Sequence, residues 1–130
     1  MARFLILDDE EDLGVIVQMI LELDGHEAEV ATDAETVVKM QRKRAADVLI
    51  TDIFMPDKDG FEVIREFQRE FPSVSIIAMS GGGEMLRSPR YLSSAREIGA
   101  SHSIRKPFEK EALLTVVGEV LESRARSAAK

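Results

Sequence analysis

Four short apolar runs divide the sequence, and each stops abruptly at a polar or charged residue. They cover residues 4–7, 48–50 and 76–79 and the single Ile104. Their apolar character is continuous rather than alternating, which is typical of strands covered on both faces in a parallel sheet. A weaker run at 28–31 brings the number of predicted strands to five.

Stretches with apolar residues at helical spacing alternate with these runs. The first carries a stripe that we expect to face the core and then a stop signal: Leu13, Ile16, Val17 and Ile20, followed by Asp24-Gly25. Asp33 is placed to cap a second helix, and a third has to end before Pro72 because the residue preceding a proline avoids the helical conformation. A fourth helix is predicted to begin at Ser88-Pro89. The last one carries the stripe Leu113, Val117 and Val120.

Strand and helix therefore alternate five times along the chain. Right-handed crossovers between parallel strands then predict an α/β fold, a doubly wound three-layer sandwich. The length of 130 residues suits one domain of this kind. We expect the domain to occupy residues 1–122 and a frayed polar tail to occupy 123–130.

Composition excludes several classes of function. The chain has no cysteine and only two histidines, so any metal site would need oxygen ligands. Seventeen basic against twenty-four acidic residues give a net charge of −7, which disfavours direct contact with nucleic acid. No apolar run is long enough for membrane insertion and no signal peptide begins the chain, so the cytoplasm is the expected location.

The residues that follow the predicted strands carry the chemistry, because in an open parallel sheet the carboxyl ends of the strands border one crevice. That edge would gather carboxylates, a hydroxyl and an amine: Asp8, Asp9 and Glu10, then Asp52, Ser80 and Lys106. Clustered carboxylates repel one another unless a cation neutralises them, and oxygen ligands suit Mg²⁺. Magnesium indicates phosphoryl chemistry, in which Asp52 could act as nucleophile while Ser80 and Lys106 compensate charge on the phosphoryl oxygens.

Four motifs together resemble one family, the receiver domain of two-component response regulators, in a single-domain form similar to chemotaxis regulators. The motifs are the pair Asp8-Asp9, the stretch 52–57 with Asp59-Gly60 behind it, Met79-Ser80-Gly81, and Lys106-Pro107-Phe108. The resemblance extends over essentially the whole chain. The resemblance implies a flavodoxin-like (βα)5 fold with a five-stranded parallel sheet in the order 2-1-3-4-5.

The resemblance also implies roles for individual residues. Asp52 would accept a phosphoryl group from a histidine kinase or a histidine phosphotransferase, and Ser80 and Lys106 would contact that group. Mg²⁺ would be bound directly by Asp9, Asp52 and the backbone carbonyl of Phe54, with Asp8 acting through water. The Lys106-Pro107 peptide is expected to be cis. Such a protein is not an enzyme with a separate substrate, since it catalyses only its own phosphorylation and dephosphorylation, and it signals to a separate downstream protein; a homodimer is left open.

Three positions depart from the family pattern. Ser103 stands where receivers usually carry an aromatic switch residue, so output by burial of a ring is not expected. The segment 81–87 is longer than usual, and we expect it to be a mobile loop that orders when a phosphoryl group arrives. Phe54 replaces a side chain that is often polar, and its ring is expected to shield an acyl phosphate from water.

Other interpretations compete with this one. A phosphatase of the haloacid dehalogenase kind also uses an aspartyl nucleophile, but it places a second aspartate two residues later, where this chain has Glu10 after Asp8 and Phe54 after Asp52. A flavin or nucleotide module could use the glycine-rich residues 80–83. A phosphorylation-silent receiver that acts only as a scaffold is a third alternative.

The surfaces of the predicted helices raise two further questions. The first helix carries a second apolar face, Val15, Met19 and Leu23, which would either pack against the last helix or dock the helical bundle of a kinase or phosphotransferase. The basic residues of the second helix are expected to be its solvated end rather than a nucleic-acid patch: Lys39, Arg42, Lys43 and Arg44. His26 and His102 are expected at the surface, without a role.

Overall fold

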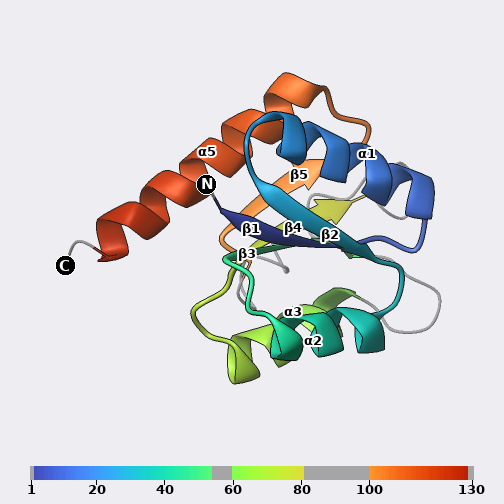
Figure 1. The fold of residues 1–130 in the computed structure, drawn as a ribbon, viewed down its shortest axis with the longest axis vertical. Helices are drawn as coiled ribbons and strands as arrows, with labels where there is room; N and C mark the ends of the chain where they lie inside the picture. The colour runs from blue at the N-terminus through green and yellow to red at the C-terminus, as the bar shows by residue number, and fades with distance from the viewer. Residues whose placement is uncertain (1, 54–59, 81–99, 129–130) are drawn as a thin grey trace.

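The computed structural model describes residues 2–53, 60–80 and 100–128 of the chain. Its five strands are all parallel and form one sheet in the order β2-β1-β3-β4-β5 (Figure 1). The strands are β1 (Arg3–Leu7), β2 (Glu27–Ala31), β3 (Val48–Asp52), β4 (Ser75–Ser80) and β5 (His102–Arg105). The helices in the described ranges are α1 (Glu11–Leu23), α2 (Ala34–Lys43), α3 (Gly60–Glu70) and α5 (Lys110–Ala128).

The helices cover both faces of the sheet, with α1 and α5 on one side and α2 and α3 on the other (Figure 1). Each face has its own apolar core. Successive residues of β1 alternate between the two cores, so Phe4 and Ile6 contact α1 and α5, while Leu5 and Leu7 belong to the cluster with α2 and α3. The predicted three-layer α/β sandwich and its strand order are therefore confirmed.

The continuous apolar runs are explained by this double coverage. Every residue of β1 and of β3 is buried. The pairing register sets Leu7 opposite Ala31 on one side and Thr51 on the other, so β1, β2 and β3 end near the same line. This alignment brings the residues after these strands to one edge of the sheet.

Helix α1 faces the sheet with a different stripe from the predicted one. Its buried residues are Gly14, Val17 and Leu21, whereas Ile16 is 51% exposed. The cause is a close approach at Gly14, where an added Cβ atom would lie 2.7 Å from Cγ1 of Val30 in β2. This contact turns Ile16 toward solvent, while Val17 of the predicted stripe is buried as expected and Leu13 and Ile20 are half-buried.

Three predicted helix ends agree with the structure, namely the end of α1, the start of α2 and the end of α3. Asp24 caps the end of α1, and Gly25 adopts the positive φ of 90° that glycine tolerates without strain. At the start of α2, the Asp33 carboxylate accepts a hydrogen bond of 2.8 Å from the backbone N–H of Thr36. This hydrogen bond and one from the Thr36 hydroxyl lower the pKa of Asp33. Helix α3 ends at Glu70, as required by the proline that follows two residues later.

The last helix is longer than predicted, since α5 continues to Ala128 and the expected frayed tail from residue 123 is wrong for the described residues. Arg124 explains much of the difference. Its guanidinium donates to the backbone carbonyl of Ser73 at 2.6 Å and to the Ser75 hydroxyl at 3.1 Å. Arginine and alanine are also strong helix formers, so the polar composition of this segment does not prevent a helix.

His26 is not the surface residue that the sequence predicted. Its side chain is only 10% exposed, and Nδ1 accepts a hydrogen bond of 3.1 Å from the backbone N–H of Ala2. The ring packs edge-on against Phe4 with 5.1 Å between centroids. Burial beside the start of β1 gives this histidine a structural role.

Several predictions fall outside the described residues: the fourth helix, the loop at 81–87 and everything concerning Phe54. Of the basic residues on α2, Lys39 and Arg42 pair with Glu35 and Glu70, in line with a solvated helix end. None of the helices in the described ranges combines the length and apolar character needed to cross a membrane.

Candidate functional site

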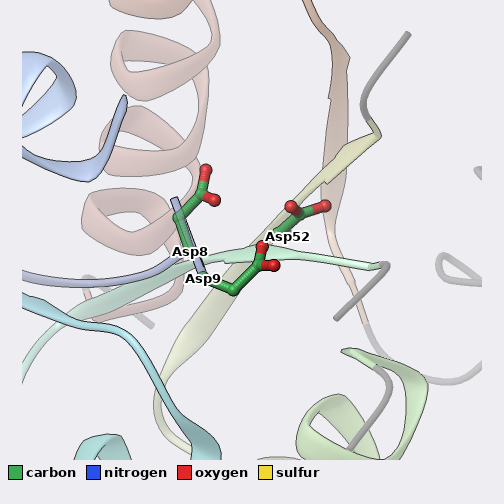
Figure 2. A group of neighbouring side chains, drawn as sticks. All are labelled: Asp8, Asp9 and Asp52. Carbon is green, nitrogen blue, oxygen red and sulfur yellow. The ribbon is translucent and has the colours of Figure 1, made fainter. Parts of the chain in front are cut away.

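Three aspartates meet at the carboxyl edge of the sheet. Asp8 and Asp9 directly follow β1, and Asp52 is the last residue of β3. One carboxylate oxygen from each lies within 4.8 Å of the others, and Figure 2 shows the three side chains gathered around the same space. The predicted convergence of Asp8, Asp9 and Asp52 is therefore what the structure has.

Lys106 reaches into this group from the end of β5. Its Nζ atom donates to Oδ2 of Asp8 at 2.6 Å and to Oδ2 of Asp52 at 3.3 Å. The side chains of Lys106, Asp8 and Asp52 are largely buried, with exposed fractions of 11%, 1% and 7%. Burial alone would lower the pKa of Lys106, but the hydrogen bond to Asp8 and the charges of both carboxylates outweigh it and raise that pKa above its ordinary value.

The chain around Asp8 holds its carboxylate in a fixed direction. The backbone N–H of Asp8 donates to the carbonyl of Ala31 at 3.2 Å, which extends the β1–β2 pairing by one residue. Oδ1 of Asp8 accepts the backbone N–H of Glu10 at 2.9 Å, leaving Oδ2 for Lys106. Both oxygens of this buried group thus have donors, as a buried carboxylate requires.

The charges at this edge suit a divalent cation. One ammonium can offset at most one of the three negative charges. The donors are all oxygens and are few, which fits the preference of Mg²⁺ for carboxylates supplemented by water or phosphate oxygens. Asp9 is exposed while Asp8 and Asp52 are buried, so the cluster opens toward solvent on the Asp9 side.

The other predicted site residues are placed less completely. Ser80 ends β4 and pairs in register with Arg105, which puts its backbone at the same edge, while its side chain and Phe54 lie outside the described residues. Glu10 is exposed and contributes its backbone N–H rather than its carboxylate. The Lys106-Pro107 peptide is cis, as the resemblance implied.

A cavity of about 420 Å³ adjoins the acidic group, between α1 and the residues that follow β5. Asp8, Glu10 and Lys106 line it, and the rest of its wall is apolar: Leu13, Ile16, Val17, Ile20, Met79, Pro107 and Phe108. This cavity was not predicted from the sequence, because the apolar stripe of α1 was expected to face the core. Phe108, an aromatic residue directly behind Lys106-Pro107, was the available signal.

A parallel doubly wound sheet with three aspartates and a lysine at its carboxyl edge defines a class of α/β domains suited to a divalent cation and a phosphoryl group. The match to a family model agrees with that class: residues 4–118 match the response regulator receiver domain. The chain therefore belongs to the receiver domain family of response regulators, and its role is in two-component signalling. Members of this family interact with histidine kinases and downstream effectors and bind Mg²⁺ at an acidic pocket.

Individual relatives support the assignment. The chain is 30% identical to the DNA-binding transcriptional regulator NtrC of Azospirillum brasilense over 98% of its own length, but it covers 26% of that protein. The crystal structure of the receiver domain of NtrX from Brucella abortus has a TM-score of 0.84 at 30% identity, covering 92% of this chain and 98% of that one. A CheY-like receiver domain protein from Methanospirillum hungatei has a TM-score of 0.88 at 25% identity, covering 98% of both chains. The chain spans about a quarter of the length of the NtrC protein and several other curated relatives.

Family membership bears on the competing interpretations. It favours a receiver over a phosphatase of the haloacid dehalogenase kind and over a flavin or nucleotide module. It does not separate a phosphorylated receiver from one that serves only as a scaffold, and that distinction depends on the chemistry of Asp52.

Proposed function

We propose that this receiver domain accepts a phosphoryl group on Asp52 from the phosphohistidine of a histidine kinase or a histidine phosphotransferase. The observation that carries the proposal is the position of Lys106, whose ammonium lies 2.6 Å from Asp8 and 3.3 Å from Asp52 inside a buried acidic group. A cation held between two carboxylates can turn toward a dianionic phosphoryl group attached to one of them.

The transfer step balances without an additional reactant. An Oδ atom of Asp52 attacks phosphorus, an O–P bond forms, the P–N bond to the donor imidazole breaks, and its electron pair returns to the ring nitrogen. Lys106 and the hydroxyl of Ser80 stabilise the negative charge on the equatorial oxygens. Hydrolysis of the acyl phosphate by water later restores the carboxylate, so the domain catalyses only its own phosphorylation and dephosphorylation.

The residues present fit a magnesium ion. Asp9, Asp52 and the backbone carbonyl of Phe54 would be direct ligands. Asp8 would act through water, because its two oxygens already accept hydrogen bonds from Glu10 and Lys106. When bound, Mg²⁺ would reduce the repulsion between the carboxylates and the incoming phosphoryl oxygens. Asp8 would orient Lys106 before the transfer, because the other oxygen of Asp8 accepts the backbone N–H of Glu10, the N-cap residue of α1.

Output would pass through contact with a separate downstream protein rather than through nucleic acid. Ser103 lies on β5 opposite Ala78 of β4, and neither side chain has a ring to bury. A signal that depends on rotation of an aromatic residue at this position is therefore not part of the proposal. The cytoplasm is the location we propose, and a homodimer is left open.

The ring of Phe54 would protect the acyl phosphate by excluding water from one side. Phe54→Asn is expected to shorten the lifetime of the phosphorylated protein, measured as the decay of the phosphorylated mass after removal of the donor. A lifetime that is unchanged or longer would contradict this role.

The central test is incubation with acetyl phosphate and Mg²⁺, read by intact mass. We expect addition of one phosphoryl group to the parent protein and none to Asp52→Ala. Lys106→Met is expected to slow the addition without abolishing the acceptor. Failure of the parent protein to gain mass, or equal gain by Asp52→Ala, would favour the scaffold alternative.

A further inference from the structure

Thr51 carries a fully buried hydroxyl near the end of the central strand β3. Among the residues that the structure describes, the buried polar and charged ones are Arg3, Asp8, Gln41, Thr51 and Asp52. Arg3 forms ion pairs with two glutamates, and the Gln41 side chain accepts a hydrogen bond from a backbone N–H. The two aspartates belong to the acidic group. The burial of Thr51 is the one that these roles leave to be explained.

The surroundings of Thr51 are apolar. Its register partners in the sheet are Leu7 of β1 and Ala78 of β4, and both belong to the core on the side of α2 and α3. Leu49 and Ile53, two residues away in either direction along the chain, lie in the same core. Valine has nearly the same shape as threonine, so packing alone would favour valine here. Burying a hydroxyl costs free energy unless that hydroxyl makes a hydrogen bond.

The hydrogen bond of Thr51 goes to the backbone of the next residue. The hydroxyl donates to the carbonyl oxygen of Asp52 at 3.0 Å. The other polar atom of the same peptide group, the N–H of Ile53, donates to the carbonyl of Met79 in β4 at 2.9 Å. Because a peptide group is planar, bonds to both of its polar atoms fix how the whole plane is turned. Thr51 and Met79 therefore hold the backbone torsion ψ of Asp52 from two sides.

This torsion sets how the Asp52 side chain is directed relative to the chain that follows it. Neighbouring residues of a strand point to opposite faces of the sheet, so the Thr51 hydroxyl acts on the Asp52 carboxylate through the backbone and not by contact. The pairing register between β3 and β4 ends at Asp52, opposite Met79. At such a strand end, a side chain that holds the next peptide supplements the strand pairing.

The Asp52 carboxylate has to be placed accurately for the chemistry proposed above. Its Oδ2 atom accepts a hydrogen bond from Nζ of Lys106 at 3.3 Å, and one of its oxygens lies within 4.8 Å of an oxygen of Asp8 and of Asp9 (Figure 2). Loss of a residue that orients a metal ligand typically lowers metal affinity by about 10–100-fold. A reacting group that is misplaced by about 1 Å can lose about a hundredfold in rate.

We propose that Thr51 is a positioning residue, whose hydroxyl holds the peptide between Asp52 and Ile53 and thereby aims the Asp52 carboxylate at Mg²⁺ and at phosphorus. The effect on rate rests on the proposed phosphoryl transfer. The effect on Mg²⁺ affinity does not depend on that transfer.

The test compares two substitutions of Thr51 with a matched control. Thr51→Val keeps the shape and removes the hydroxyl, whereas Thr51→Ser keeps the hydroxyl and removes a methyl group. Thr115→Val is the control, because Thr115 is exposed on α5 and its hydroxyl also donates to a backbone carbonyl, that of Glu111 at 2.8 Å. Urea unfolding shows that each variant is folded under the assay conditions.

Three quantities are measured for each protein. Calorimetry gives the Mg²⁺ affinity without a phosphoryl donor, and intact mass gives the rate of phosphorylation by acetyl phosphate. Hydrogen exchange without metal, followed by NMR, compares the amide of Ile53 with that of Leu49, which lies farther back in the same strand.

We expect Thr51→Val to lose at least about tenfold in Mg²⁺ affinity and in phosphorylation rate. Its Ile53 amide should exchange faster than in the parent, while the Leu49 amide is unchanged. Thr51→Ser should remain close to the parent in affinity and rate even if the lost methyl group makes it less stable, because the hydroxyl is retained. Thr115→Val should match the parent throughout.

Two results would overturn the proposal. One is a folded Thr51→Val that binds Mg²⁺ and gains the phosphoryl group as the parent does. The other is an equal loss in Thr51→Ser, which would assign the effect to packing instead of the hydroxyl. If the parent itself gains no phosphoryl group, the transfer reaction is wrong, and the Mg²⁺ affinities of the two Thr51 variants then decide whether Thr51 positions Asp52.

Discussion

Replacing Lys106 by methionine removes the cation from the acidic group while keeping an unbranched apolar side chain of similar length. The ammonium is bonded to Asp8 and Asp52, and these side chains are 1% and 7% exposed. Removing one partner of a buried ion pair leaves the other charge without compensation, which costs about 3–5 kcal/mol. Proton uptake and water entry on the open side near Asp9 would reduce that cost. We therefore expect Lys106→Met to lower the free energy of unfolding by about 3 kcal/mol at neutral pH without divalent cations.

Lys106→Met should be less stable than the parent but should bind Mg²⁺ more tightly. Without the ammonium, the net charge of the three carboxylates is no longer partly offset, so the site attracts a divalent cation more strongly. A ligand that binds only the folded state stabilises it according to its concentration relative to Kd. The stability difference between Lys106→Met and the parent should therefore narrow as Mg²⁺ is added.

The assay is urea unfolding followed by circular dichroism, with and without Mg²⁺, for the parent, Lys106→Met and Lys39→Met. Lys39 is a matched control because its side chain is 72% exposed and pairs with Glu35 on the surface. Its replacement should change stability by less than about 0.5 kcal/mol. If Lys106→Met were as stable as the control, or if Mg²⁺ widened its deficit, the buried ion pair would not have the role described.

The pH dependence of the stability difference between the parent and Lys106→Met provides an independent check. The pKa of Lys106 is raised above its ordinary value of 10.5, so the folded state holds its proton more tightly than the unfolded state does. The stabilisation is therefore fully present below pH 10.5 and is lost as the pH rises through the higher pKa of the folded state. The difference between the parent and Lys106→Met should stay constant from neutral pH to about that point and shrink above it. A difference that already disappears near neutral pH would contradict the sign of this shift.

Three further substitutions test other parts of the structure. Gly14→Ala places a methyl group 2.7 Å from Cγ1 of Val30 and should cost about 1–3 kcal/mol in urea unfolding; no loss would mean that α1 can move off the sheet freely. Asp33→Ala removes the cap of α2 that accepts from Thr36 and should cost about 1 kcal/mol, with Asp33→Asn retaining most of it. Asp9→Asn should weaken Mg²⁺ binding, measured by calorimetry, while its metal-free unfolding changes by less than about 0.5 kcal/mol because Asp9 is exposed; a large loss of stability would assign Asp9 a structural role.

Sequence alone was sufficient for the buried parallel strands because double coverage leaves continuous apolar runs, whereas the strand order was implied by the resemblance to receiver domains. It was also sufficient for the meeting of Asp8, Asp52 and Lys106, since residues that follow parallel strands have only one edge at which to lie. Neither inference depends on how a side chain is rotated. Both therefore survive errors of one or two residues in the positions of the strands.

The orientation of α1 could not be predicted in the same way. Two stripes fit the helical period, one through Ile16 and one through Gly14, and hydrophobicity favours the first. The second is used because a residue without a side chain lets the helix approach Val30 closely. Hydrophobicity patterns do not detect the contact between Gly14 and Val30. The exposed position of Ile16 and the cavity beside Ile16 follow from that contact.

The length of α5 and the burial of His26 were missed for a related reason. Both depend on single polar contacts between residues far apart in sequence, one from Arg124 to Ser73 and one from Ala2 to His26. Periodicity detects apolar surfaces and does not detect such contacts. Polar side chains that hold a helix end or the start of a strand are recognised only when the fold is known.

The contacts of Arg124 have a mechanical consequence for α5. Ser75 is the first residue of β4, so the guanidinium fastens the distal end of the helix to the amino-terminal rim of the sheet, across the molecule from Lys106. The proximal end follows shortly after the segment that carries that lysine. Arg124 thus ties the distal part of α5 to the sheet, so any shift of α5 that follows a rearrangement around Lys106 should be largest near Lys110 and smallest at Arg124.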